Sequence, residues 1–337
     1  MICTDKIKIE RLIETFNTNF KVTQLYAAYL ENFPEIITKE MIDTLTEDGT
    51  VTKEDAIAAL LSQIFGLDTD GSADDRRLFR DYIAPSVRVL NAEKYESNPY
   101  YRSVHLPNVK IGRWEFKNEH YAPYRAVICH DMMLGKDFSE VPPLGFFDRR
   151  FDFPAVLEDG NEWMTLTPVD IDTCDDAISK AHGKVVTFGL GLGYFAFMVA
   201  RKPEVESVTV VEKSPDVIKL FREYVLPYFP CPEKLNIVEA DAFDYAEKIM
   251  PNEAFDYAFV DTWRDASDGT PMYERMIKLE HLSPNTEFDY WIENFLISHR
   301  RALYFESVIR DYESGKLDTG YDEICQTLDK LGKRQTL

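Results

Sequence analysis

A glycine-rich turn and an acidic residue downstream of it are the residues of this sequence best suited to bind a small ligand. Gly189, Gly191 and Gly193 follow a short apolar run, and a helical pattern begins directly after them. Glycine lets the backbone turn tightly and lets a ligand approach the peptide plane. Glu212 ends a second apolar run, where a carboxylate can accept hydrogen bonds from both hydroxyls of a ribose. The pattern therefore indicates a nucleoside-binding site.

The spacing of the glycines disfavours a dinucleotide. The dinucleotide fingerprint requires a glycine three positions after Gly191, and Tyr194 stands there instead. The glycines alone also leave a purely structural role open, because a buried turn between a strand and a helix can need glycine for packing.

Two further carboxylates, Asp241 and Asp261, follow a third and a fourth apolar run. The carboxyl ends of parallel strands meet at one edge of a sheet, so these acids and Glu212 are expected at the same crevice. Taken singly, each Asp can instead be a helix N-cap, which is a common use of Asp after a strand.

The elements that position these residues alternate between apolar runs and helical patterns. Each run is short and continuous, as in strands buried on both faces, and the alternation predicts a parallel α/β sheet. The predicted strands are VVTFGL, SVTVVE, LNIVEA and FDYAFVD, with DYWIENFL as a fifth. The chain after the fifth run reads as helices, and no antiparallel hairpin follows it. We expect a sheet that lacks the last antiparallel strands or has its edge completed by another segment.

Two regions precede this sheet. Apolar residues recur at helical spacing from Ile7 to about Leu90, which predicts a helical N-terminal domain over residues 1–95. A β-rich connecting segment is predicted over 96–166, with strands VKIGRWEF and YRAVIC joined by KNEHYAP. Its aromatic residues, Trp114 among them, are interpreted as core packing. The sheet and a helical tail fill residues 167–337.

The motifs from about residue 165 to 293 resemble the class I S-adenosylmethionine-dependent methyltransferases. VVTFGLGLGYF resembles the first motif of that family, and EADAF resembles the third. The resemblance implies a Rossmann-like methyltransferase sheet with S-adenosylmethionine as the cofactor. The residues that it places against the cofactor are Gly189, Leu190, Gly191, Gly193, Tyr194, Glu212, Lys213, Asp241, Ala242, Phe243, Asp261 and Trp263.

The resemblance also implies individual roles. The glycines lie against the methionine part of the cofactor, Glu212 binds the ribose, and Asp241 accepts from the adenine amino group. Asp261 faces the transferable group. Thr167 and Asp170, in the segment before the glycine turn, are expected to cover the methionine end.

The leading hypothesis is a methyltransferase for a small-molecule or protein acceptor, with a small molecule favoured. Asp261 is the candidate catalytic residue, as a base that takes a proton from the nucleophile. The alternatives for Asp261 are an N-cap, a contact to the cofactor's amino group, or a metal ligand with Asp265 and Asp268. No metal is included in the predicted site.

Two other functions remain open. The glycine turn and EADAFDY are also similar to the spermidine synthase branch, which would make the protein an aminopropyltransferase using the decarboxylated cofactor. The polyamine branch would show a paired Asp where Asp261 is followed by Thr262, which argues against that function. The segment DTWR also departs from the Asn/Asp-Pro-Pro-Tyr motif of amino-methylating members. A non-catalytic nucleoside-binding module is the third hypothesis.

Composition limits which partners the protein can bind and in which cellular compartment it is expected. The 337 residues carry 38 Lys and Arg against 59 Asp and Glu, a net charge of −21, so a nucleic-acid partner is unlikely. Five widely spaced cysteines suggest neither a disulfide framework nor a zinc site. No apolar run approaches the length of a membrane span. A cytoplasmic protein is expected, and the sequence predicts no oligomeric state.

Overall fold

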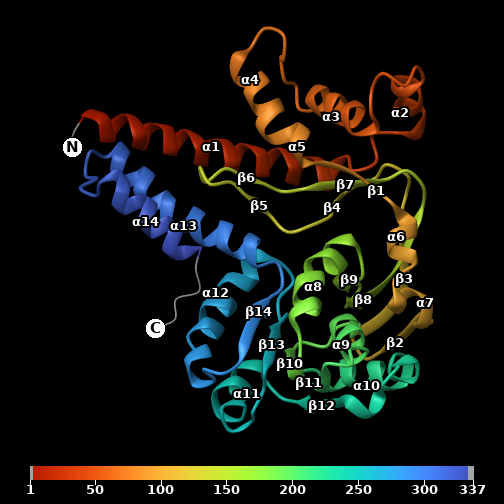
Figure 1. Cartoon of the computed structure of the whole chain (residues 1–337). Helices are drawn as coiled ribbons and strands as arrows, with labels where there is room; N and C mark the ends of the chain where they lie inside the picture. Colours follow the sequence, from red (N-terminus) through yellow and green to blue (C-terminus); the bar gives the residue numbers. More distant parts are fainter. Residues whose placement is uncertain (1–2, 333–337) are drawn as a thin grey trace. The chain divides into compact units, whose positions relative to one another are not determined.

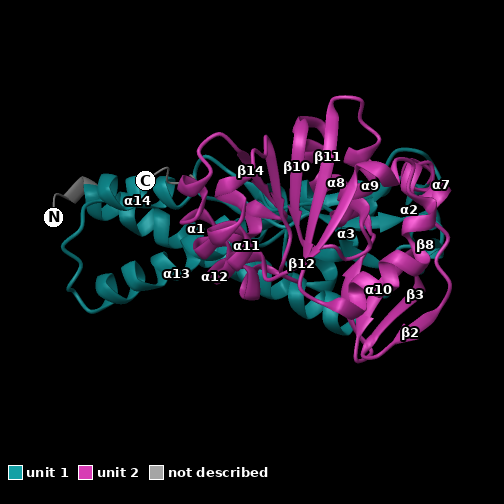
Figure 2. Cartoon of the chain, turned by 90° about the horizontal axis from the view of Figure 1, so that it is seen from below, with its two compact units in different colours: residues 1–92, 121–151, 297–333 teal, residues 93–120, 152–296, 334–337 magenta. Residues whose placement is uncertain are grey.

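The computed structural model describes residues 3–332, which form two compact units (Figure 1). Of the described residues, unit 1 comprises 3–92, 121–151 and 297–332, and unit 2 comprises 93–120 and 152–296 (Figure 2). Both units thus draw on separated parts of the chain, whereas the predicted division at residues 95 and 166 follows chain order. The reason is packing: the helices after residue 297 cover apolar residues of the N-terminal helix.

The central feature of unit 2 is a five-stranded sheet in which all neighbouring strands are parallel. The strand order is β12-β11-β10-β13-β14. Its strands are β10 (Gly183–Phe188), β11 (Val205–Glu212), β12 (Leu235–Glu239), β13 (Tyr257–Val260) and β14 (Glu287–Tyr290). The predicted α/β class is confirmed, because each strand is separated from the next by a helix.

One helix, α8 (Pro168–Lys180), precedes the first strand, and four others connect consecutive strands of the sheet. These four are α9 (Tyr194–Ala200), α10 (Pro215–Tyr224), α11 (Ala242–Lys248) and α12 (Ala266–Ile277). Strand residues such as Val186, Val210 and Ala258 are completely buried, which is why the sequence shows continuous apolar runs here.

The edge of this sheet differs in detail from the prediction. The fifth strand ends at Tyr290, because Ile292 has a φ of 47° and helix α13 (Glu293–Glu313) starts one residue later. The predicted strand DYWIENFL was therefore too long. Between residue 291 and residue 332 the structure contains helices and no further strand, so β14 is the edge.

A second sheet of unit 2 has the strand order β2-β3-β8-β9. Its strands are β2 (Val109–Ile111), β3 (Trp114–Tyr121), β8 (Phe151–Glu158) and β9 (Asn161–Thr165). The predicted single strand VKIGRWEF was wrong, because Gly112, with a φ of 60°, and Arg113 form a two-residue turn between β2 and β3. KNEHY, predicted as part of a connection, continues strand β3. Two short helices precede this sheet, α6 (Ala92–Glu96) and α7 (Pro99–Ser103).

Unit 1 is mostly helical. Its N-terminal elements are α1 (Cys3–Asn32), α2 (Lys39–Thr46), α3 (Lys53–Ile64), α4 (Ala73–Leu78), a π-helical turn (Phe79–Ile83) and α5 (Ala84–Ser86). Helix α13 and helix α14 (Tyr321–Leu331) complete it, and α14 lies beside α1 although the two stand at opposite ends of the chain (Figure 1). None of the helices in residues 3–332 is both long enough and apolar enough to cross a membrane.

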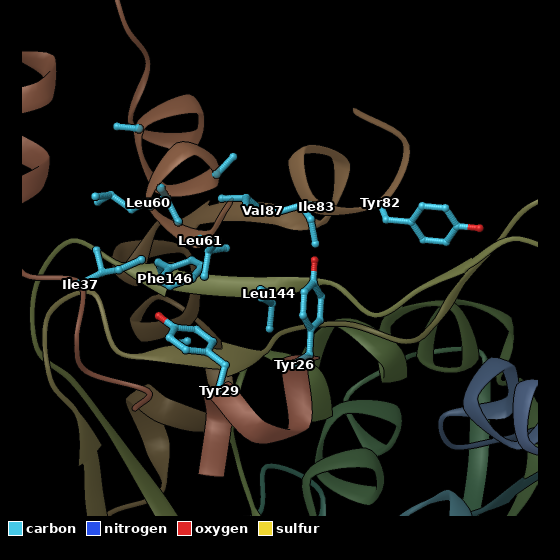
Figure 3. Close-up of a cluster of buried hydrophobic side chains, with 14 of the residues drawn as sticks. Tyr26, Tyr29, Ile37, Leu60, Leu61, Tyr82, Ile83, Val87, Leu144 and Phe146 are labelled. Atoms are coloured by element: carbon cyan, nitrogen blue, oxygen red, sulfur yellow. The ribbon is translucent and has the colours of Figure 1, made fainter. Parts of the chain in front are cut away.

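A three-stranded sheet, β1-β7-β4, lies in the core of unit 1. Its strands are β1 (Val87–Leu90), β7 (Leu144–Phe147) and β4 (Ala126–Ile128), and a separate small hairpin consists of β5 (Met133–Leu134) and β6 (Glu140–Val141). Residues 87–90 were predicted as the end of the helical region, but they pair in parallel with β7. Figure 3 shows Tyr26 and Tyr29 of α1 in the same cluster as Leu144 and Phe146 of β7.

A buried ion pair links the small hairpin of unit 1 to its C-terminal helices. Glu140 is 4% exposed and Arg301 is 8% exposed, and Glu140 Oε1 lies 3.9 Å from an Arg301 guanidinium nitrogen. The Ser298 hydroxyl donates to Glu140 Oε2 at 2.6 Å, and Arg301 Nε donates to the Leu328 carbonyl at 3.2 Å. Burial raises the pKa of Glu140 and lowers the pKa of Arg301. Loss of hydration therefore outweighs the attraction between the two charges.

Candidate functional site

The carboxyl ends of the parallel strands in unit 2 border a cavity of about 990 Å³. The turns after β10, β11, β12 and β13 contribute to its wall, and so do the β2–β3 turn and the β8–β9 hairpin of the second sheet. Open α/β sheets bind ligands at this edge, and cavities of this size hold small molecules. This cavity is the candidate site.

The structure brings most of the sequence-predicted cofactor contacts together in this cavity. Its wall includes Gly189, Leu190, Gly191, Glu212, Lys213, Asp241, Ala242, Phe243, Asp261 and Trp263. Gly193 and Tyr194 instead line a second cavity of about 20 Å³, which shares Leu190 and Asp261 with the first. A contact between each of these residues and a cofactor stays a prediction.

The glycine turn packs tightly against its own chain. Gly189 has a φ of 96°, and a Cβ added there would lie 1.9 Å from the carbonyl oxygen of Asp261. Gly191 has a φ of 47°, and its added Cβ would lie 1.8 Å from the Met164 sulfur. Glycine is required at 189 by backbone packing alone, whereas the neighbour of Gly191 is a flexible side chain at the cavity wall.

Glu212 is held at the end of β11 by two backbone hydrogen bonds. The amide of Leu190 donates to one carboxylate oxygen at 3.0 Å, and the amide of Ser214 donates to the other at 2.7 Å. Burial raises the pKa of Glu212, and the two amides oppose that rise. An ionised carboxylate offers about four acceptor positions, so each oxygen keeps one for a ligand.

Asp241 is the N-cap of α11, which is one of the two roles that the sequence predicts for it. Its Oδ1 atom accepts from the amides of Phe243 at 3.0 Å and Asp244 at 3.2 Å. The residue also lines the cavity. Capping fixes its orientation at the end of β12 and leaves Oδ2 without a hydrogen bond within residues 3–332.

Asp261 does not cap a helix, so that alternative is wrong. Helix α12 begins at Ala266, and its N-cap is Asp265. The Asp261 carboxylate lines both cavities and forms no hydrogen bond to any residue that the structure describes. Burial, reinforced by the nearby charges of Asp170 and Glu212, raises the pKa of Asp261 to about 8.

The metal alternative for Asp261 has no support in the geometry. Asp265 Oδ1 accepts from the amides of Ser267 at 2.7 Å and Asp268 at 3.4 Å, and Asp268 accepts from the Asp265 amide at 3.0 Å, so the two acids form the capping box of α12. Over residues 3–332, no group of three His, Cys, Asp or Glu side chains is arranged to hold a metal ion.

Of the two residues expected near the methionine end, one reaches the cavities. Asp170 lines both of them, and burial raises its pKa to about 6. Thr167 lines neither. Its amide and its hydroxyl donate to Asp170 Oδ2 at 2.8 Å and 2.7 Å, which caps α8 and fixes the Asp170 side chain.

Aromatic residues of the second sheet were missed as part of the site. Trp114 is 6% exposed, as core packing predicts, but it also lines the cavity with Trp163. Their rings meet edge to face with centroids 5.6 Å apart, and the Arg264 guanidinium lies 5.4 Å from the centroid of Trp163. Trp163 begins the segment WMTLTP, whose resemblance implies a place near the methionine end, whereas the only sequence signal for Trp114 was aromatic density, which does not tell a core from a cavity wall.

The side chains that line the cavity carry an excess of negative charge. Its nine carboxylates are Glu158, Glu162, Asp170, Glu212, Asp216, Asp241, Asp261, Asp265 and Asp268, and its three cations are Arg113, Lys213 and Arg264. Two of the cations already pair with carboxylates, Arg113 with Glu158 at 2.6 Å and Arg264 with Asp268 at 3.5 Å. Such a cavity favours a ligand with positive charge.

Two buried polar groups next to Asp261 lack partners. Within the described part of the chain, Thr262 Oγ1 and Trp263 Nε1 are buried and form no hydrogen bond. Trp263 is 5% exposed and belongs to the cavity wall. Because unpaired buried polar groups are rare, this end of β13 is suited to a bound molecule that supplies the missing partners.

No family model and no curated protein matches the chain. Among solved structures, a spermidine synthase in complex with the transition-state analogue AdoDATO is 22% identical, over 42% of this chain and 54% of that chain, with a TM-score of 0.31. An O-methyltransferase from Bacillus cereus in complex with SAH is 22% identical, over 28% and 44%, with a TM-score of 0.23.

A putative O-methyltransferase from Klebsiella pneumoniae is 20% identical, over 28% of this chain and 43% of that chain, with a TM-score of 0.23. The chain thus spans about half the length of the solved structures that it matches. These similarities concern the fold of part of the chain.

Proposed function

We propose that this protein binds S-adenosylmethionine in the cavity of unit 2 and transfers the cofactor's methyl group to a small-molecule acceptor. The observation that carries the proposal is the arrangement of Glu212, Asp241 and Asp261 at the ends of three parallel strands, around a glycine turn and one large cavity. The cofactor has a nucleoside that needs hydrogen-bond acceptors and a positively charged sulfur. Both suit a cavity whose wall is mostly acidic.

The residues fit the cofactor in number and type. Glu212 keeps two acceptor positions, enough for the two ribose hydroxyls. Asp241 Oδ2 is suited to the adenine amino group. Asp170 and Asp261 would lie toward the charged methionine end, where the glycine turn gives close access to the backbone.

Bound S-adenosylmethionine would supply a methyl group activated by the positive charge on its sulfur. The chain's own contribution is to orient the two reactants and to exclude water, which supplies a large part of the acceleration in such transfers. Asp261, when ionised, can accept the proton of the nucleophile. The aromatic wall with Trp163 and the unpaired Trp263 Nε1 are available to the acceptor.

Calorimetric titration tests the cofactor directly. We expect S-adenosylmethionine and S-adenosylhomocysteine to bind, and NAD to bind more weakly than either, because the turn lacks the third glycine of the pyrophosphate cradle. Tighter binding of NAD than of S-adenosylhomocysteine would replace this proposal with a dehydrogenase. Label transfer from S-adenosylmethionine to metabolite pools then separates an enzyme from a non-catalytic nucleoside-binding module.

Glu212→Ala should weaken cofactor binding at least about tenfold. The variant loses two hydrogen bonds to a charged acceptor, each worth roughly 1.5–3 kcal/mol, against about 1.4 kcal/mol for a factor of ten. Calorimetry gives the affinity, and thermal unfolding shows whether the fold persists. Glu162→Gln is the matched control, because it changes an exposed carboxylate of the same cavity. If a folded Glu212→Ala protein kept full affinity, Glu212 would serve only to hold the turn.

Aminopropyl transfer is the second candidate, favoured by the acidic cavity. The decarboxylated cofactor lacks one negative charge and would meet less repulsion from Asp170 and Asp261. Thr262 stands where that reaction would favour a second carboxylate. A competition series decides between the two: tighter binding of the decarboxylated cofactor, with transfer to an amine, would establish the second candidate.

A further inference from the structure

Three carboxylates from three separate elements share the cavity around Asp261. Asp170 comes from the first turn of α8, Glu212 from the end of β11, and Asp261 from the end of β13. Asp170 and Glu212 have backbone amides as hydrogen-bond partners, whereas Asp261 has no partner among the described residues. Asp261 is therefore the member of the group whose negative charge is least compensated.

The three positively charged side chains of the cavity wall interact with acids other than Asp261. Arg113 and Arg264 pair with Glu158 and Asp268, and Lys213 acts on its neighbour Glu212. The other titratable groups near Asp261 are Cys174 of α8 and Tyr194 of α9, which line the small cavity with it. Both are neutral, since burial raises the pKa of each. Among the described residues, Lys213 thus offsets part of the charge of Glu212, and no positive charge acts on Asp170 or Asp261.

We infer that Asp261 carries a proton in the empty cavity at neutral pH and releases it to solvent when a sulfonium cation enters. The inference rests on the proposed function and adds a coupling between ligand charge and the state of one side chain. The oxygen–hydrogen bond of the carboxylic acid breaks, and the proton leaves to the buffer. A positive charge beside Asp261 stabilises the carboxylate and offsets its repulsion by Asp170 and Glu212.

This coupling makes Asp261 a base only when the cofactor is bound. In the empty cavity the group is a neutral acid, which is consistent with its pKa of about 8. Beside the cation it is ionised and can accept a proton from the acceptor's nucleophile. A neutral thioether in the same place gives no such stabilisation, so the proton remains on Asp261.

Proton release is measured by calorimetry at pH 7 in phosphate and in Tris, two buffers that differ in ionisation enthalpy. S-adenosylmethionine is the probe, and S-adenosylhomocysteine, which differs by the sulfonium methyl, is the matched control. We expect release of about one proton with the first and clearly less with the second. The affinity for S-adenosylmethionine should also rise about fivefold between pH 7 and pH 8 and about twofold more before it levels off above pH 8, because the cation binds the ionised form of Asp261 more tightly than the protonated form.

Asp261→Asn should abolish the buffer dependence, and Glu206→Gln, a change at an exposed carboxylate of β11 outside the cavity wall, should keep it. Binding of S-adenosylmethionine to the unaltered protein with no buffer dependence, or equal release with both ligands, overturns this inference and leaves the proposed function intact. Failure of S-adenosylmethionine to bind overturns both. Equal release in Asp261→Asn would assign the proton to another group and also overturn the inference.

Discussion

Asp261→Asn should lower turnover of labelled S-adenosylmethionine by about 10²–10⁴-fold, the usual cost of losing a general base. Asparagine keeps the size of the side chain but cannot accept the proton of a nucleophile. The Asp261 amide donates to the Phe188 carbonyl at 2.9 Å, a bond that the substitution keeps, and the carboxylate forms no hydrogen bond within the described chain, so no structural contact is broken. Cofactor affinity should change by less than about tenfold, so the loss appears in kcat.

Asp265→Asn is the matched control for this experiment. Asp265 is the true N-cap of α12, four residues further along the same loop, and asparagine caps a helix about as well as aspartate. Its turnover should stay within a few-fold of the unaltered protein. If Asp261→Asn also stayed within a few-fold, transfer would proceed by alignment alone and Asp261 would be a cofactor contact.

Arg301→Met should lower the free energy of unfolding by about 3–5 kcal/mol, because it leaves Glu140 buried without its counter-charge. Denaturant unfolding followed by circular dichroism measures the loss. Lys53→Met is the control, since Lys53 pairs with Asp148 at a shorter distance of 3.0 Å but on the surface. That substitution should cost less than about 1 kcal/mol.

Proton binding gives a second readout of the same pair. Burial holds the pKa of Glu140 above its ordinary value, so the folded state binds more protons than the unfolded state, and this contribution to stability is lost as pH rises. Removal of Arg301 raises that pKa further. The cost of Arg301→Met should therefore be larger at pH 8 than at pH 5. Adding Glu140→Gln should restore part of the loss, with a coupling of about 0.5–3 kcal/mol, and zero coupling would contradict the role given to the pair.

The alternation of strands and helices in unit 2 was predictable because its cause is local. Strands buried on both faces, such as β11 with Val208 and Val210, must be apolar along their whole length. The placement of Glu212 and Asp261 at one cavity followed from parallel strand direction. The true N-cap was also visible, because Asp265 and Asp268 have the spacing of a capping box.

The features that were missed depend on contacts between distant segments. The sequence around Trp163 shows an aromatic residue but not that the β8–β9 hairpin borders the same cavity as β10. Val87–Leu90 becomes a strand only because β7, more than fifty residues later, offers a parallel partner. The apolar stripe of α1 likewise indicates that it packs, but not that its partner is α14.

The pairing of α1 with α13 and α14 has a consequence for how the chain is made. Ile9, Leu12 and Phe16 of α1 are covered by Phe305, Ile324 and Leu328. A ribosome adds about 5–20 residues per second, so roughly 15–60 s pass between the synthesis of α1 and that of α14. Throughout that interval Ile9, Leu12 and Phe16 lack these C-terminal partners, while the rest of the α1 face can already pack on residues 37–146 and the sheet of unit 2 can form. The nascent chain should therefore depend on a chaperone at its first helix, and loss of the last helix should expose the first to proteolysis.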